Sequence, residues 1–198
     1  MRHYGLSIVT PPASEPVSIA EVKEWLKIES DVTEDNGLIN GLILAATEMA
    51  ESYLNRSLIT RTYDLTMDCF PPDYYGVVYM PKNPVQSITS VKYIDNNGTL
   101  QTWDAGNYTL DNSGEQARLT AAYNISYPNT RDVINAVIIR YVAGYGDADS
   151  VPENFKTAIK VMVAEMYNNR QETVYGVSVN RVSMTAQYLL GNKRLAGF

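Results

Sequence analysis

Apolar residues recur at helical spacing in a short segment near the start of the chain. Ser18 precedes Glu21 by three residues, the capping-box spacing that satisfies free amides at a helix start. The apolar residues that follow share one face: Val22, Trp25 and Leu26. The polar residues fall on the other face: Lys23, Glu24 and Lys27. This pattern predicts a short helix near residues 18–28.

A longer helical pattern follows the acid-rich stretch ESDVTEDN and covers residues 34–54. It carries two neighbouring apolar stripes. One stripe is Leu38, Leu42, Ala45, Met49 and Tyr53, and the other is Ile39, Ile43, Ala46, Ala50 and Leu54. Because two stripes make a wide apolar face, we expect this helix to pack on more than one side, in a core or against a neighbouring subunit.

The pattern changes between Leu58 and about Ala143, where β-branched and aromatic runs are separated by Pro, Gly and Asn. The clearest hairpin joins residues 91–93 to residues 100–103. Asn97 and Gly98 are expected to supply the positive φ angles of its tight turn. Later strands are predicted in NYTLD, ARLTA and NAVIIRYVAG.

A third helix is predicted over residues 152–169, with Pro152 at its start, where a missing amide does no harm. Its inward residues are Phe155, Ala158, Ile159, Met162 and Met166. We expect it to pack on the second helix. The predicted fold class is therefore α+β, with a small helical core from residues 18–57 and 150–170, a β-rich insertion over residues 58–149, and an N-terminal extension over residues 1–17.

The remaining segment, residues 171–198, is weakly patterned, and we expect it to be a C-terminal arm. From about Val174 to Phe198 this basic arm is predicted to become ordered only on a partner. It ends in YLLGNKRLAGF. Leu189, Leu190 and Phe198 are predicted to fill apolar pockets on that partner. Lys193 and Arg194 are predicted to meet acidic residues there.

Composition excludes several function classes. The formal net charge of −6 argues against binding nucleic acid through a broad basic face. Cys69 is the only cysteine, so an intramolecular disulfide or a cysteine-based zinc site within one chain is excluded. His3 is the only histidine, which makes a Ser-His or Cys-His catalytic pair improbable. The apolar runs are too short for a secretory signal or a membrane span, so we expect a soluble protein.

The Gly-rich loop at Gly144 and Gly146 resembles a phosphate-binding junction, but carboxylates follow it at Asp147, Asp149 and Glu153. These acids would repel phosphate and are better placed to complement the positive end of a helix dipole. A structural metal near Asp147 and Asp149 remains an open alternative, although the spacing does not match a calcium loop. We expect no bound cofactor.

Fifteen tyrosines and scattered acids keep a carbohydrate-binding or carbohydrate-cleaving module open as an alternative function. Three tyrosines gather at Tyr74, Tyr75 and Tyr79, and such residues are also typical of protein interfaces. The acids of the β-rich region are Asp64, Asp68, Asp73, Asp95, Asp104 and Asp111. Most of these acids adjoin turn residues, which favours a structural role.

Several motifs occur in an order that resembles the head-tail connector (adaptor) proteins of long-tailed bacteriophages. They are EPVSIAEVKEWLKIE, then LINGLILAATEMAESYLNRSLITRTYDLTMDCFPP, then MPKNPVQSITSVKYIDNNG and YTLDNSG, then VIIRYVAGYGDADSVPENFKTAIKVMVAEMYNNRQ. The resemblance spans residues 15–171, and neither the first fourteen residues nor the arm contains a matching motif.

This resemblance implies a non-enzymatic virion protein, assembled in the host cytoplasm. About twelve copies would form a ring at the head-tail junction, between the portal protein and a tail-side stopper or completion protein. Genomic DNA would leave the head through that ring without specific binding. The acidic charge of the chain predicts a channel that is neutral or acidic, with ESDVTEDN at or near the lumen.

Overall fold

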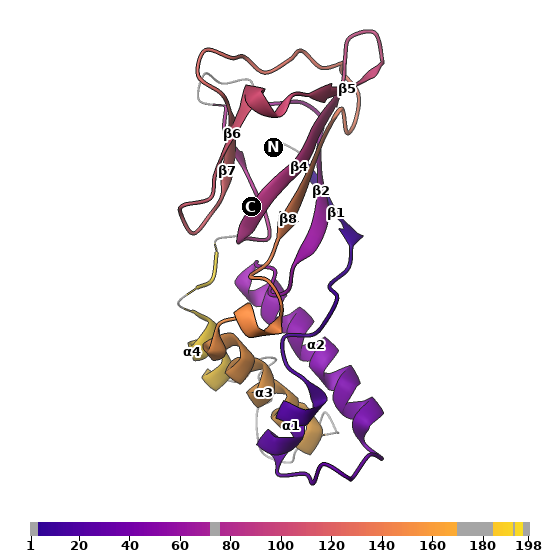
Figure 1. The fold of residues 1–198 in the computed structure, drawn as a ribbon, viewed down its shortest axis with the longest axis vertical. Coiled ribbons are helices and arrows are strands. Elements are labelled where there is room, and N and C mark those ends of the chain that lie inside the picture. Colours follow the sequence, from indigo (N-terminus) through magenta and orange to yellow (C-terminus); the bar gives the residue numbers. More distant parts are fainter. Residues whose placement is uncertain (1–3, 72–75, 170–183, 192, 196–198) are drawn as a thin grey trace. The chain divides into compact units, whose positions relative to one another are not determined.

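The protein is described by a computed structural model that covers residues 4–71, 76–169, 184–191 and 193–195. The chain divides into two compact units, whose elements are labelled in Figure 1. The β unit is formed within residues 1–12 and 60–144, and the helical unit within residues 13–59 and 145–197. The predicted α+β class is confirmed, with the strand-rich region between the second and third helices.

Two antiparallel sheets make up the β unit. The larger sheet has five strands in the order β1 (Tyr4–Thr10), β2 (Arg61–Met67), β8 (Val137–Ala143), β4 (Val85–Ile94) and β5 (Leu100–Trp103). The smaller sheet has the order β3 (Val78–Tyr79), β7 (Arg118–Ala121) and β6 (Tyr108–Asp111). The strands predicted in NYTLD, ARLTA and NAVIIRYVAG are confirmed as β6, β7 and β8.

Alternating side chains from both sheets form the core of the β unit. On β8, every second residue from Val137 to Ala143 is buried, as expected for a strand with one covered face. Tyr141 stacks on Tyr63 of β2 with ring centroids 5.6 Å apart. Phe70 stacks on Tyr127 at 4.8 Å and tilts against Trp103 at 5.5 Å. Aromatic packing therefore accounts for part of the high tyrosine content.

The β4–β5 hairpin is confirmed, but its turn differs from the prediction. Gly98 has a positive φ of 86°, whereas Asn97 does not adopt a positive φ. The loop is longer than a two-residue turn, and its ends are joined by a hydrogen bond from the Asp95 amide to the Thr99 carbonyl. The Asp95 carboxylate also accepts hydrogen bonds from the amides of Asn97 and Thr99, both at 2.9 Å. The chain therefore reverses through an Asx turn at Asp95 rather than through two left-handed residues.

The N-terminal segment is more than an extension. Residues 4–10 form β1, which pairs with β2 from Tyr4 opposite Met67 to Thr10 opposite Thr62. The sequence prediction missed this strand because most of its side chains are exposed, so no alternation marks a buried face. His3 lies outside the described residues.

The helical unit contains α1 (Ile19–Leu26), α2 (Asn36–Leu54), α3 (Glu153–Asn168) and α4 (Met184–Gly191). Short 3₁₀ turns occur at η1 (Ala105–Asn107) in the β unit and at η2 (Ala148–Ser150) before α3. The capping box of α1 is confirmed: the Glu21 amide donates to Ser18 Oγ at 3.2 Å, and the Ser18 amide donates to Glu21 Oε2 at 2.6 Å. No helix within the described ranges combines the length and apolar character of a membrane span.

The two faces of α1 differ from the prediction. Lys23, expected on the polar face, is buried, and its ammonium donates to the carbonyls of Ser30 and Val32 at 3.3 and 2.5 Å. Trp25, expected on the apolar face, is 46% exposed, and Lys160 Nζ lies 5.6 Å from its ring centroid. The long lysine side chain reverses the expected pattern because its ammonium group reaches carbonyls of the following turn.

Helices α2 and α3 share one core, as predicted. The second stripe of α2 is buried throughout, namely Ile39, Ile43, Ala46, Ala50 and Leu54. Four of the five residues predicted to face inward on α3 are also buried, namely Phe155, Ala158, Ile159 and Met162. Helix α3 packs against α2 and also against α1 and α4.

The C-terminal segment is not wholly an unpatterned arm. Residues 184–191 form α4, which packs on α3 within the chain itself. Ala186 and Leu190 of α4 are fully buried in the core of the helical unit. Packing against α3 explains this helix, which the sequence alone did not indicate because eight residues are too few for a clear period.

Candidate interaction surfaces

Two of the five predicted interface residues lie on α4 and pack inward. Leu190 has no exposed surface, and Leu189 is half-buried against the same core. Asn154 Nδ2 of α3 donates to the Leu189 carbonyl at 3.1 Å, which ties the two helices together. In this structure, Leu190 therefore already fills a pocket of its own chain.

Two further predicted residues follow α4 and contact the end of α2. Arg56 Nε donates to the Lys193 carbonyl at 2.7 Å, and the Arg194 guanidinium lies 4.9 Å from the ring centroid of Tyr53. The fifth residue, Phe198, lies outside the described residues. The role of these residues toward a partner stays a prediction.

Sequence reasoning missed the exposed side of α4. Met184 and Tyr188 are 77% and 83% exposed, one turn apart on the face opposite Leu190. Their i, i+4 spacing was the available signal. This spacing marks a shared face only if residues 184–191 form a helix, and the sequence pattern predicted an arm there.

The outer side of α2 also presents apolar residues. The first stripe predicted for this helix is only partly covered, since Leu38 remains 40% exposed and Ala45 is exposed. Leu44, which belongs to neither predicted stripe, is 44% exposed. The wide apolar face expected from sequence thus exists, and the chain itself covers only one side of it.

The acid-rich turn before α2 is held in place by a buried lysine and a half-buried tyrosine. The two hydrogen bonds of Lys23 fix residues 30–32, and the Tyr167 hydroxyl donates to the Asp35 carboxylate. The side chains of Glu29, Asp31 and Glu34 remain exposed. The turn therefore presents carboxylates to the outside from a fixed backbone.

The Gly-rich loop has a structural explanation. Gly146 adopts a φ of 139°, and a Cβ at this position would lie 2.7 Å from Ser150 Oγ. The Asp147 carboxylate accepts from the Ser150 amide and hydroxyl at 3.1 and 2.8 Å, so it caps η2. These bonds, the hydroxyl bond first, lower the pKa of Asp147. Among the residues described, no group of three or more His, Cys, Asp or Glu side chains is placed to hold a metal ion.

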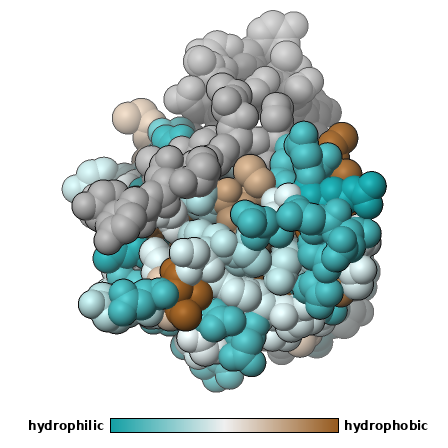
Figure 2. Space-filling model, turned by 90° about the horizontal axis from the view of Figure 1, so that it is seen from above, coloured by the Kyte–Doolittle hydropathy of each residue, from teal (hydrophilic) through white to brown (hydrophobic). Residues whose placement is uncertain are grey.

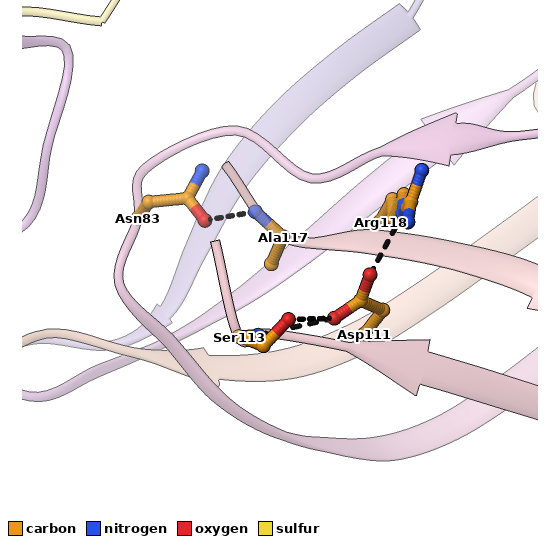
Figure 3. Close-up of polar contacts among 5 residues, drawn as sticks. All are labelled: Asn83, Asp111, Ser113, Ala117 and Arg118. Carbon is orange, nitrogen blue, oxygen red and sulfur yellow. Dashed lines mark hydrogen bonds and ion pairs between the residues drawn. The ribbon is translucent and has the colours of Figure 1, made fainter. Parts of the chain in front are cut away.

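The acids of the β unit are engaged in turns and pairs. Figure 3 shows Asp111, whose carboxylate accepts from the Ser113 hydroxyl at 2.6 Å and from Arg118 Nε at 2.8 Å. Beside it, the buried Asn83 accepts from the Ala117 amide at 2.7 Å. Asp64 pairs with Arg140 through two bonds of 2.8 Å. Three other acids accept backbone amides, namely Asp68, Asp95 and Asp104, and Asp73 lies outside the described residues.

Asp95 and Asp111 do not have the pKa that a general acid in sugar cleavage requires. A general acid in a glycosidase needs a raised pKa. Here the hydrogen bonds of Ser113 and then Arg118 lower the pKa of Asp111 to about 2, and the bonds from Gln101 and Thr99 lower that of Asp95. Turn and pairing roles are therefore filled by Asp64, Asp68, Asp95, Asp104 and Asp111.

The tyrosines divide between core and surface. Tyr127 donates to the Gly76 carbonyl at 2.6 Å, and burial raises its pKa to about 12. Tyr79 and Tyr123 are 50% and 92% exposed, while Tyr74 and Tyr75 lie outside the described residues. The face drawn in Figure 2 is mainly hydrophilic, with hydrophobic residues in small separate groups. An interface role for the exposed tyrosines stays a prediction.

Solved structures with the same fold come from gene transfer agent particles. The neck of an empty particle, computed with C6 symmetry, contains a chain with a TM-score of 0.78 at 18% identity, and 98% and 97% of the two chains are covered. The virion of the native particle contains one with a TM-score of 0.78 at 20% identity and coverage of 98% and 96%. The native neck, computed with C12 symmetry, gives a TM-score of 0.75 at 19% identity and coverage of 98% and 97%.

Two further comparisons concern the sequence. No curated protein matches the chain significantly. The family model described as head completion protein matches residues 15–187, which is most of the chain and includes all of α1, α2 and α3. The chain therefore belongs to the head completion protein family.

Proposed function

We propose that this protein is a structural component of a phage-like virion that forms a ring at the head-tail junction and links the head to the tail. The family match over residues 15–187 carries this proposal. The similarity in fold to chains of particle necks, over 98% of this chain, supports it. Neither comparison favours the carbohydrate-binding or carbohydrate-cleaving alternative, and the lowered pKa values of Asp95 and Asp111 do not suit a general acid for sugar cleavage.

The ring contains about twelve copies. The similar neck chain of the native particle lies in an assembly computed with C12 symmetry, which supports this number. The ring sits beneath the portal and receives a tail-side stopper or completion protein. The protein has a scaffolding role in the virion, assembles in the host cytoplasm and carries out no catalysis.

Genomic DNA passes through the ring without specific binding. The net charge of −6 per copy disfavours the counterion release that holds DNA on basic surfaces. Because Lys23 fixes the acid-rich turn with its carboxylates outward, this turn is the leading candidate for the lumen or its rim. Gel-shift titration of the purified protein with duplex DNA is expected to give no complex at physiological salt. Micromolar affinity that falls steeply with salt would contradict the channel assignment.

Inactivating the gene in the strain that produces the particle tests the function itself. Particles made without this protein are expected to consist of separate heads and tails in electron micrographs. Expression of the intact chain from a plasmid is the control and should restore tailed particles. Normal tailed particles in the inactivated strain would contradict the proposal.

A further inference from the structure

The outer face of α2 lacks the charges that an exposed helix usually carries. From Asn36 to Thr47 the helix contains no Asp, Glu, Lys or Arg, although Leu38 and Leu44 are 40% and 44% exposed. A helix that faces water on one side normally carries polar and charged residues there. This half of α2 therefore has the surface expected of a helix that is covered in the assembled state.

Two glycines lie in the middle of this face. Gly37 and Gly41 are one turn apart and exposed, and a Cβ at either position would meet nothing within 4 Å. The fold of the chain does not require glycine at these positions, where this residue weakens a helix. Close approach of another backbone or of a large side chain does require it. At 100° per residue, Leu38 and Leu44 flank Gly41 on either side, so the face is a shallow depression between two apolar walls.

Helix α4 carries large exposed side chains, in contrast to the glycines of α2. Met184 and Tyr188 protrude one turn apart, and α4 contains no charged residue. Both residue types are enriched at protein interfaces. Helix α3 packs against both α2 and α4, which Figure 1 draws on different sides of it, and α4 also contacts α2. The helical unit therefore has a shallow depression on the outer face of α2 and two protruding side chains on α4.

A closed ring of more than two identical copies needs such a pair of surfaces. Its contacts are heterologous, so each copy uses one patch toward one neighbour and a different patch toward the other. Copies that each carry a net charge of −6 repel one another, which favours contact through uncharged faces. The outer faces of α2 and α4 meet both conditions.

We infer that, in the ring proposed above, α4 of one copy docks on the outer face of α2 of the next copy. Met184 and Tyr188 fill the depression over Gly37 and Gly41, between Leu38 and Leu44. The occupant of the α2 face is a second copy of this chain. The portal and the tail-side component are the competing occupants that the experiment must exclude.

Cysteine cross-linking tests this contact in the full-length chain. In a C69S background, which removes the exposed native thiol, A45C and Y188C are introduced together and the assembled ring is treated with a short bismaleimide. A ladder of covalent oligomers is expected. Mixing the two single-cysteine variants should give a covalent dimer and no larger species, because each copy then carries one thiol. N168C with Y188C, an exposed control pair in the same unit, should give no ladder.

A second pair of variants separates assembly from folding. Gly41→Gln places a long side chain in the depression and should abolish ring formation while the melting temperature of the monomer stays the same or rises. Tyr188→Ala should weaken ring formation at least tenfold in concentration, whereas Tyr123→Ala, at an equally exposed tyrosine of the β unit, should leave it unchanged. Native mass spectrometry measures the oligomers.

The outcomes distinguish this inference from the function on which it rests. A ring without the A45C–Y188C cross-link, or a ring that survives Gly41→Gln, overturns the docking of α4 on α2 and leaves the function intact. If the wild-type chain forms no ring, alone or on tail-less heads, the proposed function fails and the docking contact fails with it.

Discussion

Helices α2 and α3 bury their inner faces in one core but differ on their outer faces. Helix α3 carries charges along its length, at Glu153, Lys156, Lys160 and Glu165. Lys156 is buried, and Lys160 contacts both Glu153, at 3.3 Å, and the ring of Trp25. Helix α3 is also covered by α1, α2 and α4. The first three turns of α2 carry no charge and leave two leucines exposed. Helix α2 also contacts α1, α3 and α4, so the number of neighbouring helices does not distinguish the two. The difference is the uncharged first half of α2, since this helix carries its charges, Glu48 and Glu51, near its C-terminal end.

The stability of the isolated chain therefore does not explain the surface of α2. Exposed glycines and leucines contribute little to a monomer, and charged residues would suit solvent better. The subunit contact proposed above accounts for this pattern, whereas the charges of α3 need no partner. Substitutions in the shared core, in the turn before α2 and on each outer face test this difference between the two helices.

The largest effect is expected in the shared core. Phe155→Ala and Ile43→Ala should each lower the free energy of unfolding, by about 3–5 and 2–5 kcal/mol, because both side chains are at most 1% exposed and leave cavities. Urea unfolding followed by circular dichroism measures this. Losses below about 1 kcal/mol on either helix would show that the two do not share a core.

The turn that leads into α2 should depend on Lys23. Lys23→Met keeps the aliphatic stem but removes the ammonium that donates to Ser30 and Val32, and it should cost about 1–2 kcal/mol. Limited proteolysis should then cut within residues 29–35 faster than in the wild type. Lys27→Met, at an exposed position after α1, is the control and should change neither quantity. Equal cleavage in both variants would contradict the role of Lys23.

A substitution on the outer face of α2 is expected to raise the stability of the monomer rather than lower it. Gly41→Ala should stabilise the monomer by about 0.5–1 kcal/mol, because the added methyl group meets open space and alanine favours the helix. Gly5→Ala is the contrasting control, since its Cβ would lie 2.7 Å from Thr66 Oγ1. It should destabilise the chain. A loss of stability in Gly41→Ala would mean that the monomer itself needs this glycine.

The smallest effect is expected on the outer face of α3. Glu153→Gln removes the ion pair with Lys160, in which the Glu153 side chain is 71% exposed, and should change the free energy of unfolding by less than about 0.5 kcal/mol. Thermal melts at low and at high salt should differ little between the variant and the wild type. A change above 1 kcal/mol would show that the charges of α3 are structural.

Local rules predicted much of this fold. The capping box at Ser18, the stripe from Ile39 to Leu54 and the run that forms β8 depend on spacing within one segment, and all three are confirmed. The face of Lys23 was predicted incorrectly, because its burial depends on carbonyls seven and nine residues further along the chain. Strand β1 and helix α4 show no clear local period, and each is ordered by pairing or packing with a distant element.

The candidate surfaces were harder to predict than the fold. The sequence correctly indicated that α2 has more apolar surface than one core needs. It assigned Leu190 to a partner, whereas this side chain packs inside its own unit. Whether an apolar residue faces a core or a partner depends on which neighbours the fold brings close, and local pattern does not contain that information. Met184 and Tyr188 share one exposed surface only because residues 184–191 form a helix.

An electron cryo-microscopy map of the assembled particle neck tests the central claim most directly. We expect a closed ring of this protein at the head-tail junction, with α4 of each copy seated over Gly37 and Gly41 of the next. A neck that lacks this chain would contradict the proposed function. A ring in which the outer face of α2 is open to solvent, or is covered by a different protein, would contradict the subunit contact.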